Sequence, residues 1–173
     1  VQERGGVTLL DEIYLGLSYD ETFGQTALDL DDNVISINSF SKYFSMTGWR
    51  LGWLVVPEGL VAPIERLAQN LFICPSVISQ QAALACFEED SLAEFERRRS
   101  AFKSRRDWFL PALEAAGFRV PVAPDGAFYA WADCSEWLKA WGLNDSWDLA
   151  FEVMKRAQVA ITPGRDFGSA ETS

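Results

Sequence analysis

The chain has 173 residues, of which 49% are hydrophobic, so it can form one domain or one domain with part of another. Its formal net charge of −10 disfavours binding to the phosphate backbone of nucleic acids. The sequence has no histidine, and its three cysteines lack C-x-x-C spacing; it thus predicts no metal site, no disulfide framework and no histidine-based catalysis.

Three short apolar runs in the first third of the chain predict strands, at residues 7–10, 34–38 and 53–56. Continuous runs of this kind are typical of strands that are buried on both faces of an α/β sheet. Between the first two runs, residues 16–33 are acidic and turn-rich and have no helical period. The pattern therefore predicts a sheet whose first crossover is irregular.

A helical pattern follows over residues 60–71 and again over 76–87. The pair Ser91 and Glu94 has the spacing of a capping box and predicts the start of a long helix. Gly117 predicts its end, and Pro111 predicts a kink or a break before that end.

The last third has a different pattern. Residues 118–122 and 127–131 flank a Pro-Asp-Gly turn and predict two strands. An amphipathic helix is expected over 146–157, and a strand over 159–162. The sequence thus predicts an α/β part followed by a smaller α+β part.

Chemically useful side chains follow the first two predicted strands. Asp11 and Tyr14 come directly after the first, and Ser39, Ser41 and Lys42 come directly after the second. In open α/β sheets, ligands bind outside the carboxyl ends of the strands. If the two strands are parallel, all five residues lie at the same edge of the sheet.

This group suits a cofactor with an aldehyde, a pyridine ring and a phosphate. The Lys42 amine can form a Schiff base with an aldehyde, and the Asp11 carboxylate can keep a pyridine nitrogen protonated. The Tyr14 phenol can bond a ring oxygen. Serine hydroxyls and the guanidinium of Arg50 can bind a phosphate.

The segment Ser-Phe-Ser-Lys-Tyr-Phe-Ser-Met-Thr-Gly-Trp-Arg-Leu-Gly-Trp, at 39–53, closely resembles the cofactor-attachment signature of the class I/II aminotransferases. These are fold type I enzymes that use pyridoxal 5'-phosphate (PLP). Asp-Glu-Ile-Tyr at 11–14, Gly-Ala-Phe-Tyr at 126–129 and Thr-Pro-Gly-x-x-Phe-Gly at 162–168 resemble other blocks of the family, in the same order. The resemblance covers essentially the whole chain.

The resemblance implies a role for each candidate residue. Lys42 would form the Schiff base with PLP and then act as the base that moves the substrate proton. Asp11 would pair with the pyridinium nitrogen, and Tyr14 would bond the phenolic oxygen of PLP. The phosphate-binding residues would be Ser39, Ser41 and Arg50.

The resemblance also implies a domain organisation. Residues 1–95 would be part of a large PLP-binding domain with a mixed, mainly parallel sheet. A connecting helix at 96–116 would lead to a truncated small domain at 117–173. Both ends of the sequence look cut, and the family's phosphate loop, ring-stacking aromatic residue and carboxylate-binding arginine have no match here. We therefore expect the isolated chain to lack useful transaminase activity, and we do not assign the carboxylate-binding role to Arg165.

Four functions remain open at this level. The first is an aminotransferase, active as a homodimer, that moves an amino group between an amino acid and a 2-oxo acid. The second is another fold type I PLP enzyme, such as a lyase, a decarboxylase or a synthase. The others are a non-catalytic effector domain of a transcription regulator and an inactive, truncated product.

No apolar run has the length of a membrane span and no signal peptide opens the chain, so we expect a cytoplasmic protein without membrane contacts.

Other conspicuous residues have structural interpretations. Glu12 is expected to point away from Asp11 and to have no catalytic role. Cys74, Phe128 and Tyr129 are expected to be core residues. A basic cluster is expected to be a solvated helix face: Arg97, Arg98, Arg99, Lys103, Arg105 and Arg106.

Overall fold

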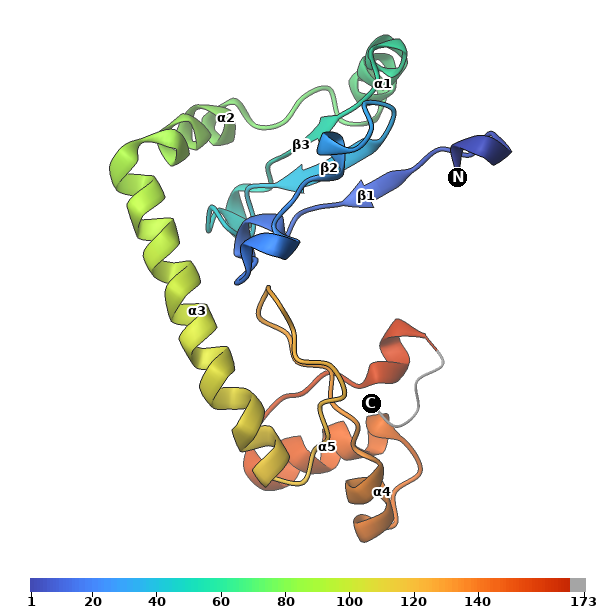
Figure 1. Ribbon diagram of the computed structural model, residues 1–173, viewed down its shortest axis with the longest axis vertical. Coiled ribbons are helices and arrows are strands. Elements are labelled where there is room, and N and C mark those ends of the chain that lie inside the picture. Colours follow the sequence, from blue (N-terminus) through green and yellow to red (C-terminus); the bar gives the residue numbers. More distant parts are fainter. Residues whose placement is uncertain (169–173) are drawn as a thin grey trace. The chain divides into compact units, whose positions relative to one another are not determined.

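The computed structural model describes residues 1–168 and divides into two compact units, whose elements are labelled in Figure 1. The first unit comprises Val1–Lys103 together with Asp125–Ala127. The second comprises Ser104–Pro124 and the chain from Phe128 onward. The candidate cofactor residues all belong to the first unit.

The first unit contains a three-stranded sheet in the order β1-β2-β3, formed by β1 (Leu9–Asp11), β2 (Ile35–Ser39) and β3 (Gly52–Val55). Strands β1 and β2 are parallel, and β2 and β3 are antiparallel. The sheet is therefore mixed, and the three strands lie where the sequence predicts them, to within one or two residues.

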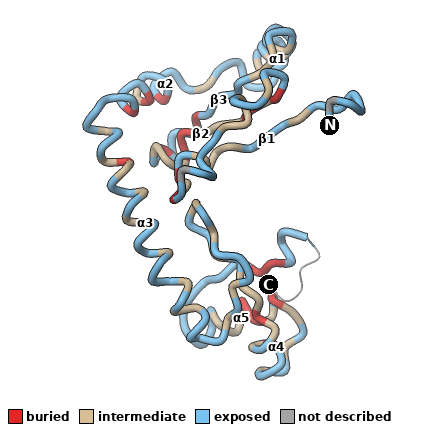
Figure 2. Tube along the Cα trace, in the orientation of Figure 1, coloured by how far each residue is buried: buried red, intermediate tan, exposed pale blue. Residues whose placement is uncertain are grey.

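The prediction that the strands are buried on both faces of the sheet is wrong for the two outer strands. The side chain of Leu9 in β1 is 58% exposed and that of Leu54 in β3 is 48% exposed. Only the central strand β2 contains a fully buried residue, Ser36. Figure 2 shows buried positions at β2 and α2 (Val77–Leu84). The outer strands each have one strand neighbour, and the described chain covers little of their surface.

A compact aromatic core lies under the loop that joins β2 to β3. The Phe40 ring lies 5.0 Å from the rings of Phe44 and Trp53, measured between centroids. Residues of this loop, of α2, of the 3-10 turn that follows α2 and of α3 (Glu89–Ala115) form the buried cluster: Phe40, Met46, Leu51, Ala83, Cys86 and Phe95. The loop that carries Lys42 is thus held by the packing of its own neighbours.

Helix α1 (Glu58–Leu71) follows β3 as expected, and α2 continues into a 3-10 turn at Ala85–Phe87. The irregular crossover between β1 and β2 consists of short 3-10 turns, as its composition indicates. Among residues 1–168, no helix has the length and apolar composition that a membrane span requires.

Helix α3 begins earlier than the sequence predicts. Its first residue is Glu89, and the amide of Leu92 already donates to the carbonyl of Glu88. Ser91 therefore lies inside the helix, and the capping box is wrong. The acidic residues Glu89 and Asp90 occupy the first turn instead, where the helix dipole favours negative charge.

The end of α3 agrees with the prediction at Gly117 but not at Pro111. Gly117 has a φ of +89°, and its amide donates to the carbonyl of Glu114. The amide of Phe118 donates to the carbonyl of Leu113, which completes a Schellman motif. Pro111 is accommodated within the helix, which continues to Ala115, so it does not break α3.

The second unit contains α4 (Ser135–Trp141) and α5 (Ser146–Ala157), the latter with the predicted bounds. Leu149 of α5, which is 1% exposed, packs with Cys134 and Leu138 in its core. Strands at 118–122, 127–131 and 159–162 were predicted, but none of these described ranges forms one. A single antiparallel bridge joins Arg119 to Asp133.

The predicted hairpin fails because its turn pairs with another segment. Gly126 forms an antiparallel bridge with Ser18. The amide of Ala127 donates to the carbonyl of Leu17 over 3.1 Å, and the amide of Tyr19 donates to that of Asp125 over 2.7 Å. The backbone groups that a hairpin would have used are thus satisfied by residues 17–19.

Candidate cofactor site

The carboxyl ends of β1 and β2 lie side by side. In their parallel register Asp11 pairs with Ile37, and the amide of Glu12 donates to the carbonyl of Ile37 over 2.9 Å. Asp11 is the last residue of β1 and Ser39 is the last residue of β2. The parallel arrangement that the sequence required for a shared site is therefore present.

Lys42 and Tyr14 meet at this edge. The Nζ atom of Lys42 lies 5.2 Å from the centroid of the Tyr14 ring. This distance is within the range of a cation–π contact. Both side chains are half-buried. Tyr14 accepts a hydrogen bond from the amide of Leu17 at the start of a 3-10 turn, Leu15–Leu17, which fixes its backbone.

The loop between β2 and β3 folds back on itself, so that Arg50 near its end lies beside Ser41 near its beginning. Arg50 Nη1 donates to the Thr47 carbonyl over 2.9 Å and approaches Ser41 Oγ at 3.4 Å. Ser39 Oγ accepts from the amide of Ser41 over 3.0 Å, and Thr47 Oγ1 donates to the Ser41 carbonyl over 2.5 Å. A guanidinium and two hydroxyls are thereby gathered in one loop, a donor set that fits a phosphate.

The αL conformation of Arg50, with a φ of +51°, helps to turn the chain into β3. At the other end of this turn, Gly52 faces β2 so closely that an added Cβ would lie 2.6 Å from the carbonyl oxygen of Asn38. Because that oxygen is a backbone atom, the position requires glycine.

Asp11 is exposed, and its Oδ1 accepts a hydrogen bond from the amide of Ile13 over 3.2 Å. Asp11 and Tyr14 both line a hollow of about 500 Å³, whose wall also includes Asp125–Ala127. The carboxylate and the phenol thus border one open space.

Glu12 has a structural role that the sequence did not reveal. Its carboxylate accepts hydrogen bonds from Thr26 Oγ1 (2.8 Å), the amide of Ala27 (2.7 Å) and Ser36 Oγ (2.6 Å). Burial alone would raise the pKa of Glu12, but the hydrogen bonds from Ser36, Ala27 and Thr26 outweigh it and lower the pKa below 4.5. Glu12 therefore ties the crossover to β2.

The comparisons with known proteins identify the family. The model of the family "Aminotransferase class I and II" matches residues 1–173. This chain belongs to the class I and II aminotransferase family.

Two curated relatives and two solved structures illustrate the match. The chain is 39% identical to valine–pyruvate aminotransferase of Mycobacterium tuberculosis, covering 92% of this chain and 40% of that protein. It is 36% identical to aspartate aminotransferase of Sulfurisphaera tokodaii, covering 96% of this chain and 41% of that protein.

Among solved structures, an aminotransferase from Mycobacterium tuberculosis is 38% identical, with a TM-score of 0.84 over 95% of this chain and 42% of that one. The aromatic aminotransferase from Pyrococcus horikoshii OT3 is 32% identical, with a TM-score of 0.86 over 99% and 45%. The fold is thus that of fold type I aminotransferases, and the chain spans about two fifths of the length of these relatives.

Arg165 is engaged in a contact within the second unit. Its Nη1 donates to Asp145 Oδ2 over 2.6 Å, and its guanidinium lies 5.6 Å from the centroid of a Trp147 ring. Asp145 also caps α5 by accepting from the amide of Asp148. The family's carboxylate-binding role therefore stays unassigned.

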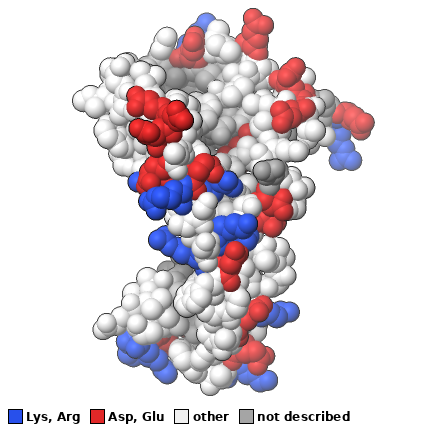
Figure 3. All heavy atoms as spheres, turned by 60° about the vertical axis from the view of Figure 1, so that its left-hand side comes forward, with Lys and Arg blue, Asp and Glu red and all other residues white. Residues whose placement is uncertain are grey.

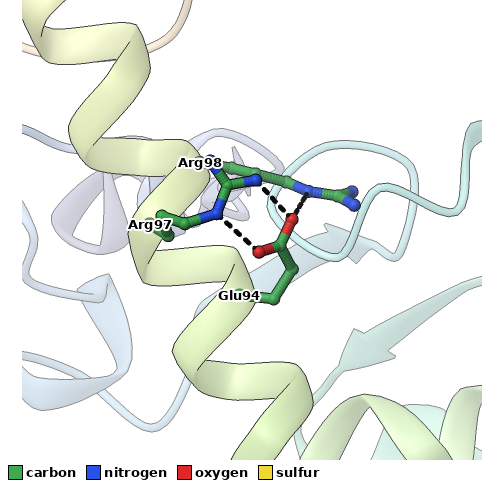
Figure 4. A network of polar contacts seen from close by, with 3 residues as sticks. All are labelled: Glu94, Arg97 and Arg98. Atoms are coloured by element: carbon green, nitrogen blue, oxygen red, sulfur yellow. Dashed lines mark hydrogen bonds and ion pairs between the residues drawn. The ribbon is translucent and has the colours of Figure 1, made fainter.

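Four arginines of the basic cluster pair with acidic residues on the same helix α3: Arg97, Arg98, Arg99 and Arg106. Glu94 accepts from Arg97 and Arg98 at 2.7 Å each (Figure 4). Hydrogen bonds from these two arginines hold the pKa of Glu94 at about 2. Figure 3 shows basic and acidic side chains interleaved on this face. The Glu94 pairs are those of a solvated helix face, as expected. Arg99 and Arg106 depart from that expectation, because both are partly buried and donate to the carbonyls of Ser18 and Pro124.

Three residues that were expected in the core lie at the surface. Cys74 is exposed, and Phe128 and Tyr129 are 45% and 58% exposed. The last two lose their expected environment because the hairpin that would have buried them does not form. Cys74 lies in a turn after α1 where Ile73 has a φ of +71° and is itself 77% exposed.

Proposed function

We propose that the full-length protein containing this chain is a PLP-dependent aminotransferase that transfers an amino group between an amino acid and a 2-oxo acid. The observation that carries this proposal is the placement of Lys42 Nζ 5.2 Å from the Tyr14 ring centroid, at the carboxyl ends of two parallel strands. The names of the relatives, which include valine–pyruvate and aspartate aminotransferases, support the same reaction class.

The candidate residues would supply a partner for each polar part of the cofactor. Asp11 would hold the proton on the pyridine nitrogen, and the Tyr14 hydroxyl would donate to the ring oxygen. The phosphate would be bound by Ser39, Ser41 and Arg50, of which the last two already lie 3.4 Å apart, Nη1 to Oγ. When bound, PLP supplies an electron sink that acidifies the substrate α-carbon.

Lys42 would hold the cofactor covalently through Nζ and, once released, would move the proton at the substrate α-carbon. A general base must be unprotonated when it accepts a proton.

Borohydride reduction of the full-length protein with PLP, followed by peptide mapping, tests the assignment. We expect a pyridoxyl label on Lys42, and no label in Lys42→Ala. A matched control is Lys139→Ala, which removes an exposed lysine of α4 and should leave the label on Lys42. A label on another lysine in the unmodified protein would refute the proposed role.

We also propose that the full-length protein is a cytoplasmic homodimer and that the 173-residue chain alone has no useful transaminase activity. The chain covers about 40% of the relatives' length, so the rest of the cofactor pocket and the substrate clamp would come from elsewhere in the protein. An assay of the chain beside the full-length protein tests this, and robust turnover by the chain alone would contradict it.

A further inference from the structure

Tyr43, the residue after Lys42, connects the cofactor loop to helix α3. Its hydroxyl donates to Glu96 Oε1 over 2.7 Å. Its ring lies 5.5 Å from that of Phe95, centroid to centroid, and packs edge-on against Phe44. The backbone position of Lys42 is therefore coupled to the side chain of Glu96.

The same tyrosine contacts the loop that carries Tyr14. Gly16 lies against the Tyr43 ring so closely that a Cβ added at Gly16 would lie 2.8 Å from Cγ of Tyr43. Gly16 is two residues from Tyr14. The Tyr43 ring therefore packs directly between the Lys42 loop and the Tyr14 loop and sets the distance between them.

Arg99 provides a second connection to the Tyr14 loop. It donates from Nη1 to the carbonyl of Ser18 over 2.8 Å and from Nε to Glu96 Oε2 over 2.8 Å. Glu96 thus bonds Tyr43 with one oxygen and Arg99 with the other. A single carboxylate on α3 thus links both loops: it bonds Tyr43 directly and reaches the Ser18 carbonyl through Arg99.

Protonation states agree with this arrangement at neutral pH. Burial and the Glu96 carboxylate raise the pKa of Tyr43 to about 12, so its hydroxyl stays a donor. Burial alone would raise the pKa of Glu96, but the hydrogen bonds from Arg99 and Tyr43 lower it, so it stays an acceptor.

We propose that Glu96 and Arg99 are positioning residues for the aminotransferase reaction: they join the Tyr43 and Ser18 loops to α3 and thereby hold Lys42 Nζ over the Tyr14 ring. This inference rests on the proposed function of Lys42. The side chains of Glu96 and Arg99 are 46% and 34% exposed, so their ion pair itself contributes little to stability. Their effect should therefore be larger on catalysis than on unfolding.

The test uses the full-length protein loaded with PLP and the variant Glu96→Ala. A looser Lys42 tether samples further staggered rotamers, so the visible circular dichroism per bound cofactor should fall to about half. The proton transfer loses alignment, so kcat should fall about tenfold to a hundredfold while KM changes little. Glu96→Gln, which keeps an oxygen for Tyr43, should lie between Glu96→Ala and the unmodified protein.

The matched control is Glu94→Gln, on the surface of the same helix. Among residues 1–168, the Glu94 carboxylate bonds only its neighbours Arg97 and Arg98. This variant should leave kcat and dichroism unchanged. Unchanged kcat and dichroism in Glu96→Ala, with or without a lower melting temperature, would overturn the positioning role. Equal changes in Glu94→Gln would also overturn it.

Two further measurements keep the outcomes distinguishable. If Glu96→Ala does not fold, Tyr43→Phe decides, because it removes only the hydroxyl and keeps the ring against Gly16. Unchanged dichroism and kcat in this variant would then refute the inference.

Borohydride labelling of the unmodified protein tests Lys42 itself. A label on Lys42 with no effect at Glu96 rejects the positioning role alone, whereas a label elsewhere rejects the proposed function as well.

Discussion

Replacing Glu12 should destabilise the protein without removing any group from the cofactor site. Its carboxylate accepts three hydrogen bonds, from Thr26, Ala27 and Ser36, at 2.6–2.8 Å. At about 1 kcal/mol each, Glu12→Ala should lower the free energy of unfolding by about 3 kcal/mol. Glu12→Gln keeps one acceptor oxygen and should cost about 1 kcal/mol.

The pH dependence gives this prediction a second test. The folded-state pKa of Glu12 lies below its ordinary value of 4.5. The ionised carboxylate therefore makes its full contribution to the free energy of unfolding above pH 4.5, and this contribution is lost as the pH falls through the folded-state pKa. The difference in urea unfolding free energy between the unmodified protein and Glu12→Gln should therefore be largest near pH 7 and shrink below pH 4.5. A matched control is the exposed Glu65→Ala, expected to change stability by less than about 0.5 kcal/mol. A cost below that size for Glu12→Ala would refute the reasoning.

Three further outcomes are expected in the full-length protein. Asp11→Asn should keep PLP binding, measured by absorbance titration, but lower kcat about a hundredfold, because an amide does not hold the pyridinium proton; an unchanged kcat would contradict the assignment. Arg50→Lys should weaken PLP binding about tenfold, because a lysine cannot reproduce the contacts of the guanidinium with Ser41 and a phosphate; equal affinity would contradict it. Gly16→Ala should cost about 1–3 kcal/mol in thermal unfolding, because its Cβ would overlap the Tyr43 ring, and an unchanged melting temperature would show that the ring can move freely.

The parts of the site that follow from local order could be predicted. Asp11, Ser39 and Lys42 come directly after two apolar runs, and parallel pairing of those runs brings them to one edge. Once the runs are recognised as strands, the position of each residue along the chain determines which edge it reaches.

Contacts between distant segments could not be predicted in this way. Glu96 lies 53 residues from Tyr43, and nothing in the sequence around either one indicates that they bond. The Pro-Asp-Gly turn before Ala127 was recognised from its composition, but its partner is Leu17 rather than a neighbouring strand. Turn chemistry specifies that the chain reverses, and tertiary packing selects the segment that it pairs with.

The pairing of Tyr19 with Asp125–Ala127 has a consequence for the order of folding. The two segments are separated by 108 residues from Tyr19 to Ala127, and closing a flexible loop of that length costs about 4 kcal/mol in chain entropy. The few backbone hydrogen bonds of this pairing can offset that cost only after β1, β2 and α3 have already shortened the effective loop. We therefore expect residues 125–127 to dock late, so that the hollow beside Asp11 acquires its last wall at the end of folding.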